Sequence, residues 1–552
     1  MKKTVLIHAN YWDGERMCRD GQIEIADGYV DAVYGACDEQ NLKPYNIEET
    51  CFEDMSGIYL FPAWIDSHLH IPGDFLFEKF GVVLTGFESL ETYLDRLSTW
   101  KKQCEKQCEK QCEKQCEKQD YQDLDVAGDL WLRGFGWNAV IMDRAENGYE
   151  QLWDFLNQEF ADKPVLLFSD DYHNCICNKK ALDAVKRAGI AVEPDEWGLI
   201  KEKDIFLLTR YLPEMCFSES QIEMAVLAYQ EKLLSYGITA VQTLMFLGGN
   251  GLREWKVLLA LERKGLLKLK VNLALTVQPW EKLEESRQRY GQLMKIEKES
   301  RFYGGHIQIH TVKLYMDGVV ENHTAYMEAP YEDQAGRGKN FWDLETLREF
   351  CRELDEEGHQ IHIHAIGDGA VHDAVTALVY AMDRNGTARK HRHVIAHLQI
   401  ASDEDIRLMG QYGIIASIQP YWFPQSEKDY GLEKPFLGER AEEEYKARTL
   451  EAMGVLITGA SDSPVTPRPA PVLGIAMAGN RCQEKERLPV PAMIRAFTRN
   501  GAYQLFRERE LGMIQRGFRA DLVGYREAIW EQVDGDEIPA FLMVDGKIYL
   551  KN

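Results

Sequence analysis

Short apolar segments alternate with helical patterns through the middle of the chain, and this alternation limits the fold more than any other feature. The apolar segments end at His70, Gln242, Thr276, Met316, His364, His397, Gln419 and Asp462. Helical patterns lie between several of them, over residues 220–234, 344–357 and 402–412. Such alternation is typical of parallel βαβ units. It predicts a parallel α/β barrel over residues 61–74 and 216–514, with its chemistry at the carboxyl ends of the strands.

The two ends of the chain have a different pattern, of short strands separated by turns. Asp-Gly pairs, a strong hairpin signal, occur at residues 13–14, 20–21, 27–28 and 545–546. Between two of them, residues 22–25 alternate polar and apolar side chains, as a half-buried strand does. We therefore expect one small β domain, a β-sandwich, built from residues 1–60 and 515–552.

Residues 75–215 do not follow the rhythm of the barrel, and we interpret them as an insertion after the first barrel strand that could cover the barrel mouth. The insertion contains KQCE four times in tandem, which places Cys104, Cys108, Cys112 and Cys116 four residues apart. Lys and Glu at i,i+3 modestly favour a helix. Because the repeat lacks the histidines and paired cysteines of zinc sites, we expect a surface helix and not a thiolate metal site or redox array.

The charge of the chain restricts its partners. Lys and Arg number 64 against 89 Asp and Glu, a formal net charge of −25 among 552 residues. Such an acidic chain repels phosphate backbones and anionic membrane surfaces. No apolar stretch approaches the roughly 20 residues of a membrane span. We expect a small-molecule substrate and no binding to nucleic acid or membranes. A homodimer is possible, because dimers are the commonest oligomers of soluble proteins.

The cysteines and the start of the chain predict a cytoplasmic location. Outside the repeat, eight of the 12 cysteines are scattered, mostly singly, which does not suggest a disulfide scaffold. The apolar run after Lys2 and Lys3 ends before His8 and is too short for a signal peptide.

Four short segments carry residue types that bind metals. The first is Ile65-Asp66-Ser67-His68-Leu69-His70, where alternation on a strand directs both imidazoles to the same side. The second, residues 360–368, repeats this spacing at His362 and His364; the others bring His393 and His397, then Asp462 before a proline. Each alone is as typical of a hydrogen-bonded core group as of a ligand. In successive βα units they converge on one barrel mouth, which predicts a centre for zinc or a similar ion.

Lys313 is unusual because apolar residues Val312 and Leu314 flank it in a predicted strand. A lysine that points into a barrel is costly to bury without a partner. The alternative is a side chain that extends to the rim of the barrel.

With these ligand segments and the inward lysine, the sequence resembles the amidohydrolase superfamily of metal-dependent TIM-barrel hydrolases. It resembles most the branch called amidohydrolase family 3, which includes N-substituted formamide deformylases. The similarity runs through FPAWIDSHLH, the residues 132–137, GITAVQT, VKLYMDG, HIHAIGDGA, AHLQ, ASIQPYWF and ITGASDSPV to Gly517–Leu522, and so covers nearly the whole chain.

The resemblance implies a role for each matching residue. His68 and His70 match the ligands of the more buried of two metals, His364 and His397 those of the second, and Lys313 a bridging lysine carboxylated on its amine. Asp462 matches an aspartate that is both ligand and proton shuttle. With His364 and His397, it forms the expected catalytic group. The cofactors implied are two divalent ions, with zinc the best match to these ligands.

The expected substrate contacts come from the same comparison, with two departures. His173 matches a histidine of the insertion that reaches toward the substrate, and Trp137 ends the similar run 132–137. Asn322 and His323 stand where the family usually has a serine–arginine pair, so His323 is expected at the substrate. Lys179 replaces the serine that usually follows the residue at Asn178. These changes leave the metal ligands intact and alter the substrate pocket.

The function that the resemblance implies is hydrolysis of a non-peptide C–N bond in an amide-like small molecule, of the N-acyl or N-formyl amine type, by metal-activated hydroxide. Two alternatives stay open. A mononuclear deaminase would use His68, His70, His364 and Asp462 with an unmodified Lys313 to release ammonia from a cyclic amidine. A metal-free binding protein on the same scaffold would use none of them as ligands.

Overall fold

The computed structural model describes residues 3–35, 50–115, 131–170, 172–201, 217–244 and 252–552, with isolated residues between 204 and 212. The chain divides into two compact units. The first comprises Met1–Ile71, Gln230–Met245 and Leu259–Asn552, and the second Pro72–Tyr229 and Phe246–Leu258. The division falls within α7 (Glu219–Ser235) and α8 (Leu252–Arg263).

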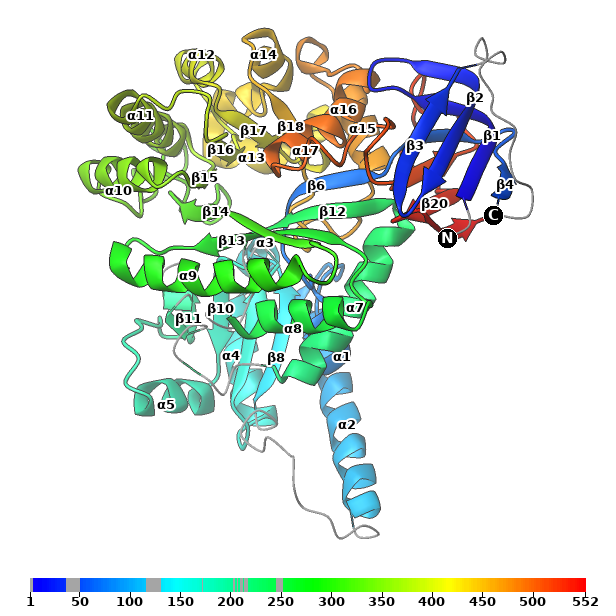
Figure 1. Cartoon of the computed structure of the whole chain (residues 1–552). Helices are drawn as coiled ribbons and strands as arrows, with labels where there is room; N and C mark the ends of the chain where they lie inside the picture. Colours follow the sequence, from blue (N-terminus) through cyan, green and yellow to red (C-terminus); the bar gives the residue numbers. More distant parts are fainter. Residues whose placement is uncertain are drawn as a thin grey trace. The chain divides into compact units, whose positions relative to one another are not determined.

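The first unit contains a sheet of eight parallel strands, which confirms the predicted TIM barrel (Figure 1). In order these are β6 (Trp64–Leu69), β12 (Ile238–Thr243), β13 (Lys270–Thr276), β14 (Ile307–Tyr315), β15 (Gln360–Ala365), β16 (Val394–His397), β17 (Ile415–Ile418) and β18 (Ile457–Gly459). The first and last strands meet through two backbone hydrogen bonds, from Asp462 N to His68 O (2.8 Å) and from His70 N to Ser463 O (2.9 Å). Closure of the barrel therefore brings the HxH segment beside Asp462.

Helices follow the strands where the amphipathic pattern predicts them. The expected helices correspond to α7, to α10 (Leu344–Glu356) and to α12 (Asp403–Tyr412). The α12 helix begins because the Ser402 side chain accepts from Asp405 N, and it ends at Gly413, whose φ of 72° is left-handed. Other helices of this unit include α9 (Leu283–Ser300), α11 (Asp368–Asn385) and α17 (Arg499–Gln504). Among the described helices, none has the length and apolarity that crossing a membrane requires.

Polar side chains cross the barrel interior as one hydrogen-bonded chain. Gln242 donates to Thr311 Oγ1 (2.7 Å), and Thr311 donates to Gln360 Oε1 (2.6 Å). Gln504 enters from α17, donates to Gln242 Oε1 (2.9 Å) and accepts from Thr458 Oγ1 (2.6 Å). These bonds satisfy the buried amides and hydroxyls, so they hold strands β12, β14, β15 and β18 in place relative to α17.

Strands from both ends of the chain form one eight-stranded sheet, as the turn pattern predicts (Figure 1). Its order is β21 (Lys547–Lys551), β20 (Phe541–Val544), β19 (Leu522–Tyr525), β5 (Tyr59–Pro62), β1 (Lys3–Trp12), β2 (Met17–Ala26) and β3 (Tyr29–Tyr34), with β4 (Thr50–Asp54) paired to β1. The pairs Asp27-Gly28 and Asp545-Gly546 make two-residue hairpin turns, with both residues of each pair at positive φ.

The Asp20-Gly21 pair does not form a hairpin turn; it lies inside β2, at a register shift against β1. Asp20 has a φ of 49°, and a Cβ on Gly21 would lie 2.7 Å from the Tyr11 ring. The pair therefore forms a bulge where the two strands approach closely.

The second unit has its own sheet and core. The sheet order is β11 (Leu199–Lys201), β10 (Asn174–Cys177), β9 (Val165–Ser169), β8 (Leu132–Trp137) and β7 (Val82–Val83). Its helices include α1 (Phe75–Phe80), α2 (Leu90–Gln115), α3 (Ala139–Arg144), α4 (Gly148–Glu159) and α5 (Lys179–Arg187). The backbone of α2 includes Cys104, Cys108 and Cys112 of the KQCE repeat, whereas Cys116 lies outside the described residues. The domain boundaries expected from the sequence stay a prediction.

Candidate metal centre

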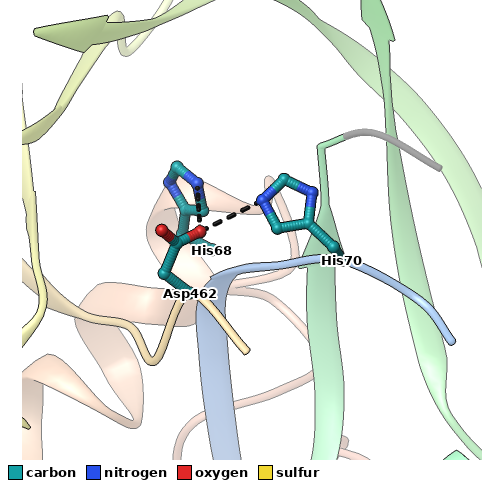
Figure 2. A group of neighbouring side chains, drawn as sticks. All are labelled: His68, His70 and Asp462. Atoms are coloured by element: carbon teal, nitrogen blue, oxygen red, sulfur yellow. Dashed lines mark hydrogen bonds and ion pairs between the residues drawn. The ribbon is translucent and has the colours of Figure 1, made fainter. Parts of the chain in front are cut away.

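His68, His70 and Asp462 form the centre of the site at the carboxyl end of β6 (Figure 2). Asp462 Oδ1 lies 3.0 Å from His68 Nε2 and 3.1 Å from His70 Nε2, although the aspartate is almost 400 residues away in sequence. His68 and Asp462 are buried, and His70 is half-buried. One carboxylate oxygen between two imidazole nitrogens is a donor set that fits zinc or a similar divalent ion.

His397 and His364 extend this cluster. The His397 ring lies 4.9 Å from the His68 ring and 4.5 Å from the His364 ring, measured between centroids. His364 Nε2 is 3.2 Å from the carbonyl oxygen of Gly318. The structure therefore brings His68, His70, His364, His397 and Asp462 together, and their role as metal ligands stays a prediction.

Lys313 is buried on β14 and its Nζ has no hydrogen-bond partner among the described residues. Burial lowers the pKa of this amine to about 7, although the negative charge of Asp462 partly opposes the shift. An inward lysine with so low a pKa spends much of its time as a neutral amine, the form that reacts with carbon dioxide. The prediction of an inward orientation, and not of a side chain reaching the rim, thus agrees with the structure.

Burial keeps three histidines at the site, His68, His362 and His397, in the neutral form that binds metals. Burial lowers the pKa of His68, His362 and His397 well below the usual value, and for His68 the positive charge of Lys313 adds to this effect. Burial alone would raise the pKa of Asp462, but its hydrogen bond from His70 and the nearby His397 outweigh burial and lower the pKa. Neutral imidazoles beside an ionised carboxylate are what a divalent cation requires.

Several residues that contact the cluster were not among the predicted site residues. Gln419 Oε1 accepts from His397 Nδ1 at 3.1 Å, and the Trp422 ring stacks on His397 at 5.4 Å. His362 Nε2 lies 3.1 Å from His68 Nδ1. The HxH spacing at residues 362–364 and the polar end of β17 were signals for His362 and Gln419, but no local pattern indicated Trp422.

Two buried aspartates support the loops that carry the ligands. Asp66 Oδ1 accepts from the backbone N–H of His68 and of Ser461, both at 3.1 Å, and so ties β6 to the segment before Asp462. Burial raises the pKa of Asp66 to about 7. Asp317 accepts from the backbone N–H of Ile366, Gly367 and Tyr326, and so joins the ends of β14 and β15.

The three residues predicted to contact the substrate have different surroundings. His323 is half-buried, lies 2.8 Å from Asp333 Oδ2 and packs against Tyr331 and Phe436. Trp137 is fully buried in the core of the second unit and donates to Leu167 O (2.9 Å). His173 lies in the turn between β9 and β10 of the same unit. The predicted contacts of these three residues with a substrate stay predictions.

A second group of ligand-type residues, Asp355, His391 and His393, lies outside the centre. His393 Nδ1 accepts from Ile361 N, so its proton is on Nε2, which donates to Asp355 Oδ1 at 2.9 Å. The other oxygen of Asp355 accepts from Asn385 and Thr387. A metal on His393 would need the lone pair that this tautomer lacks, so we interpret the group as a structural hydrogen-bond cluster.

Buried neutral histidines away from the centre predict how stability depends on pH. Burial lowers the pKa of His310, His359 and His393, so the unfolded chain binds more protons below about pH 6.5. The free energy of unfolding should be retained above that pH and fall as the pH drops to 5, by up to about 1.4 kcal/mol per pH unit for each histidine. Urea denaturation at pH 7, 6 and 5 measures this. Equal or greater stability at pH 5 would contradict it, and His310→Gln should show a smaller decrease.

The fold and this site define a class of barrel hydrolases that depend on a metal, and comparison with known proteins identifies the family. The model of the amidohydrolase family matches residues 52–540, and the chain belongs to this family. It is 26% identical over 537 residues to "Putative amidohydrolase YtcJ" of Bacillus subtilis (strain 168), which covers 91% of this chain and 90% of that protein.

Solved structures have the same fold. An uncharacterized metal-dependent hydrolase from Pyrococcus furiosus matches 96% of this chain and 100% of its own, at 22% identity and a TM-score of 0.68. An adenosine deaminase from Xanthomonas campestris with bound zinc matches 100% of this chain and 93% of its own, at 11% identity and a TM-score of 0.54. A Xaa-Pro dipeptidase matches 100% of both chains, at 12% identity and the same TM-score of 0.54. The neighbours of this fold thus include a deaminase and a peptidase.

Proposed function

We propose that this metal-dependent hydrolase cleaves a C–N bond of an amide-like small molecule, of the N-acyl or N-formyl amine type. The observation that carries the proposal is the position of Asp462 Oδ1, within 3.1 Å of two imidazole nitrogens and near the buried amine of Lys313. A carboxylate in this position can bind a cation and also accept a proton.

The donor set supports two divalent ions, with zinc the best match. His68 and His70 would hold one ion and His364 and His397 the other, with Asp462 as a further ligand. Lys313, carboxylated on Nζ, would bridge them; this modification replaces a buried amine without a hydrogen-bond partner with an anion. When bound, such ions lower the pKa of water and polarise a carbonyl group.

The residues of the chain supply the proton transfers. Water adds to the carbonyl carbon while its proton passes to a carboxylate oxygen of Asp462. The C–N bond then breaks, and Asp462 returns the proton to the leaving nitrogen, so the products are an acid and an amine. The hydrogen bonds of Asp66 to the backbone on both sides of the cluster keep Asp462 beside His68 during these steps.

The alternatives differ in metal content or in substrate. A mononuclear deaminase would leave Lys313 as a free amine, and its low pKa is compatible with that state. A hydrolase of peptide bonds would share the two-metal centre but take a dipeptide. A metal-free binding protein is disfavoured because neutral imidazoles around a carboxylate favour a cation.

Metal analysis with a substrate panel tests the proposal. Protein loaded with zinc in the presence of ¹³C-bicarbonate should contain two zinc ions per chain and show a carbamate ¹³C signal that is absent in Lys313→Ala. The panel comprises N-formyl and N-acyl amines, Xaa-Pro dipeptides and cyclic amidines. Turnover of the first group supports the proposal. One ion, no carbamate and release of ammonia from an amidine would establish the deaminase.

A further inference from the structure

His362 occupies an interior position where a polar side chain is costly. It is fully buried on β15, and its Nδ1 has no hydrogen-bond partner among the described residues. Its neighbours on the strand, Ile361 and Ile363, are apolar and equally buried. A buried nitrogen without a partner destabilises a fold relative to an apolar side chain of similar size, so the position requires another explanation.

Within the described part of the chain, the other nitrogen of His362 makes one hydrogen bond, and its partner is His68 of the candidate metal centre. His362 Nε2 lies 3.1 Å from His68 Nδ1, with the two rings edge to face and 4.9 Å apart. The opposite nitrogen of His68, Nε2, is the one that faces Asp462. The His68 ring is therefore held between His362 on one side and the ligand cluster on the other.

Metal binding by His68 would fix the direction of this hydrogen bond, because it fixes which nitrogen of the ring carries the proton. A ligating Nε2 must have a free lone pair, so the proton of the His68 ring is then on Nδ1. Nδ1 must donate, and the nearby acceptor is His362 Nε2. The proton of His362 is then on its own Nδ1, which explains why a nitrogen without a partner is retained in the interior.

We infer that His362 is a positioning residue that accepts the Nδ1–H of His68 and so fixes the tautomer and ring orientation of this metal ligand. Ligand histidines usually donate this proton to a carboxylate, a carbonyl group or water; here another imidazole takes that place. The inference rests on the proposed function only in treating His68 as a metal ligand. It does not require a particular substrate.

The test compares zinc affinity with stability in the metal-free protein. His362→Leu removes the acceptor but fills the space, so it should weaken zinc binding 10- to 100-fold in competition with a chelator. Without metal, its urea midpoint should equal or exceed that of the wild type, because the buried unpaired nitrogen is gone. His362→Gln places an amide oxygen near the former Nε2 and should restore affinity to within about threefold, since the contact is to one acceptor.

Two further variants separate the possible outcomes. Ile363→Ala leaves a cavity on the same strand without touching His68, so it should lower the urea midpoint and leave zinc affinity unchanged. His68→Ala tests the ligand itself. If His68→Ala loses zinc affinity and His362→Leu does not, the inference is wrong and the proposed site stands. If His68→Ala binds zinc as the wild type does, the proposed site fails. Failure of His362→Gln to restore affinity would also overturn the inference.

Discussion

Asp462→Asn should bind metal and fold normally but lose turnover by about 10²–10⁴-fold, the range for loss of a general acid–base group. The amide keeps an oxygen that can face His68 and His70, but it cannot accept a proton from water. The backbone should tolerate the change because Asp462 has a φ of 57°, and asparagine adopts this left-handed conformation more readily than other residues with a Cβ. The kcat of protein with a measured metal content tests this expectation.

The matched control for this variant is Asp403→Asn, which changes an exposed aspartate at the start of α12 whose partner is Lys446. It should keep full activity, because surface ion pairs contribute little. Turnover of Asp462→Asn near the wild-type rate, with metal bound, would show that Asp462 is not the proton acceptor.

Lys313→Met should have opposite effects on stability and on activity. In the metal-free protein, it replaces a fully buried amine without a hydrogen-bond partner with an apolar side chain of similar length. Replacing buried charged groups in this way often stabilises a protein by about 1–4 kcal/mol. Activity should be lost, since the proposed bridge between the metals requires the amine. Urea denaturation near pH 7 and the kcat of metal-loaded protein measure the two effects.

The pH dependence gives Lys313→Met a second test. The pKa of this amine is about 7 in the folded protein and about 10.4 in an unfolded chain. Between these values the unfolded wild type binds more protons, so wild-type stability rises with pH relative to the variant. The advantage of Lys313→Met should be largest at and below about pH 7 and decrease as the pH rises toward about 10.

Lys270→Met is the control for burial of a lysine. Lys270 is equally buried but lies 2.7 Å from Asp521 and 3.0 Å from Asp545. Its loss leaves the buried carboxylate of Asp521 without this cation, while Asp545 keeps Arg519 at 2.9 Å, so this variant should be destabilised by about 3–5 kcal/mol. If Lys313→Met also destabilises the metal-free protein by that amount, the amine of Lys313 stabilises the fold and the expectation is wrong.

The proposed mechanism depends on short distances between side chains of the first and last barrel strands, which are adjacent only because the barrel closes. The oxygen of Asp462 reaches His68 and His70 only because β18 returns beside β6. The polar chain through Gln242, Thr311 and Gln504 maintains that closure from inside the barrel. A substitution outside the ligand set, such as Gln504→Leu, would remove these contacts together with the hydrogen bond from Gln504 to Ser67 O (2.9 Å), directly before His68.

The sequence alone was sufficient for features that local periodicity encodes. Alternation of apolar strands and amphipathic helices predicted the barrel, and the ends of its strands at His70, His364, His397 and Asp462 lie within a few residues of the observed ends. Period-two spacing placed His68 and His70 on one strand, and Asp-Gly pairs predicted the hairpins at Gly28 and Gly546. These features depend on neighbouring residues, so they can be read without knowledge of the fold.

Tertiary structure decided which polar groups face one another and what surrounds them. The spacing at residues 362–364 does not tell that His364 joins the ligand cluster while His362 lies behind His68. The local sequence also does not distinguish Asp20-Gly21, which forms a bulge, from the Asp-Gly pairs that form hairpin turns. The difference is the close approach of Tyr11 from another strand. The low pKa of Lys313 has the same origin, since the burial that lowers it depends on segments far apart in the sequence.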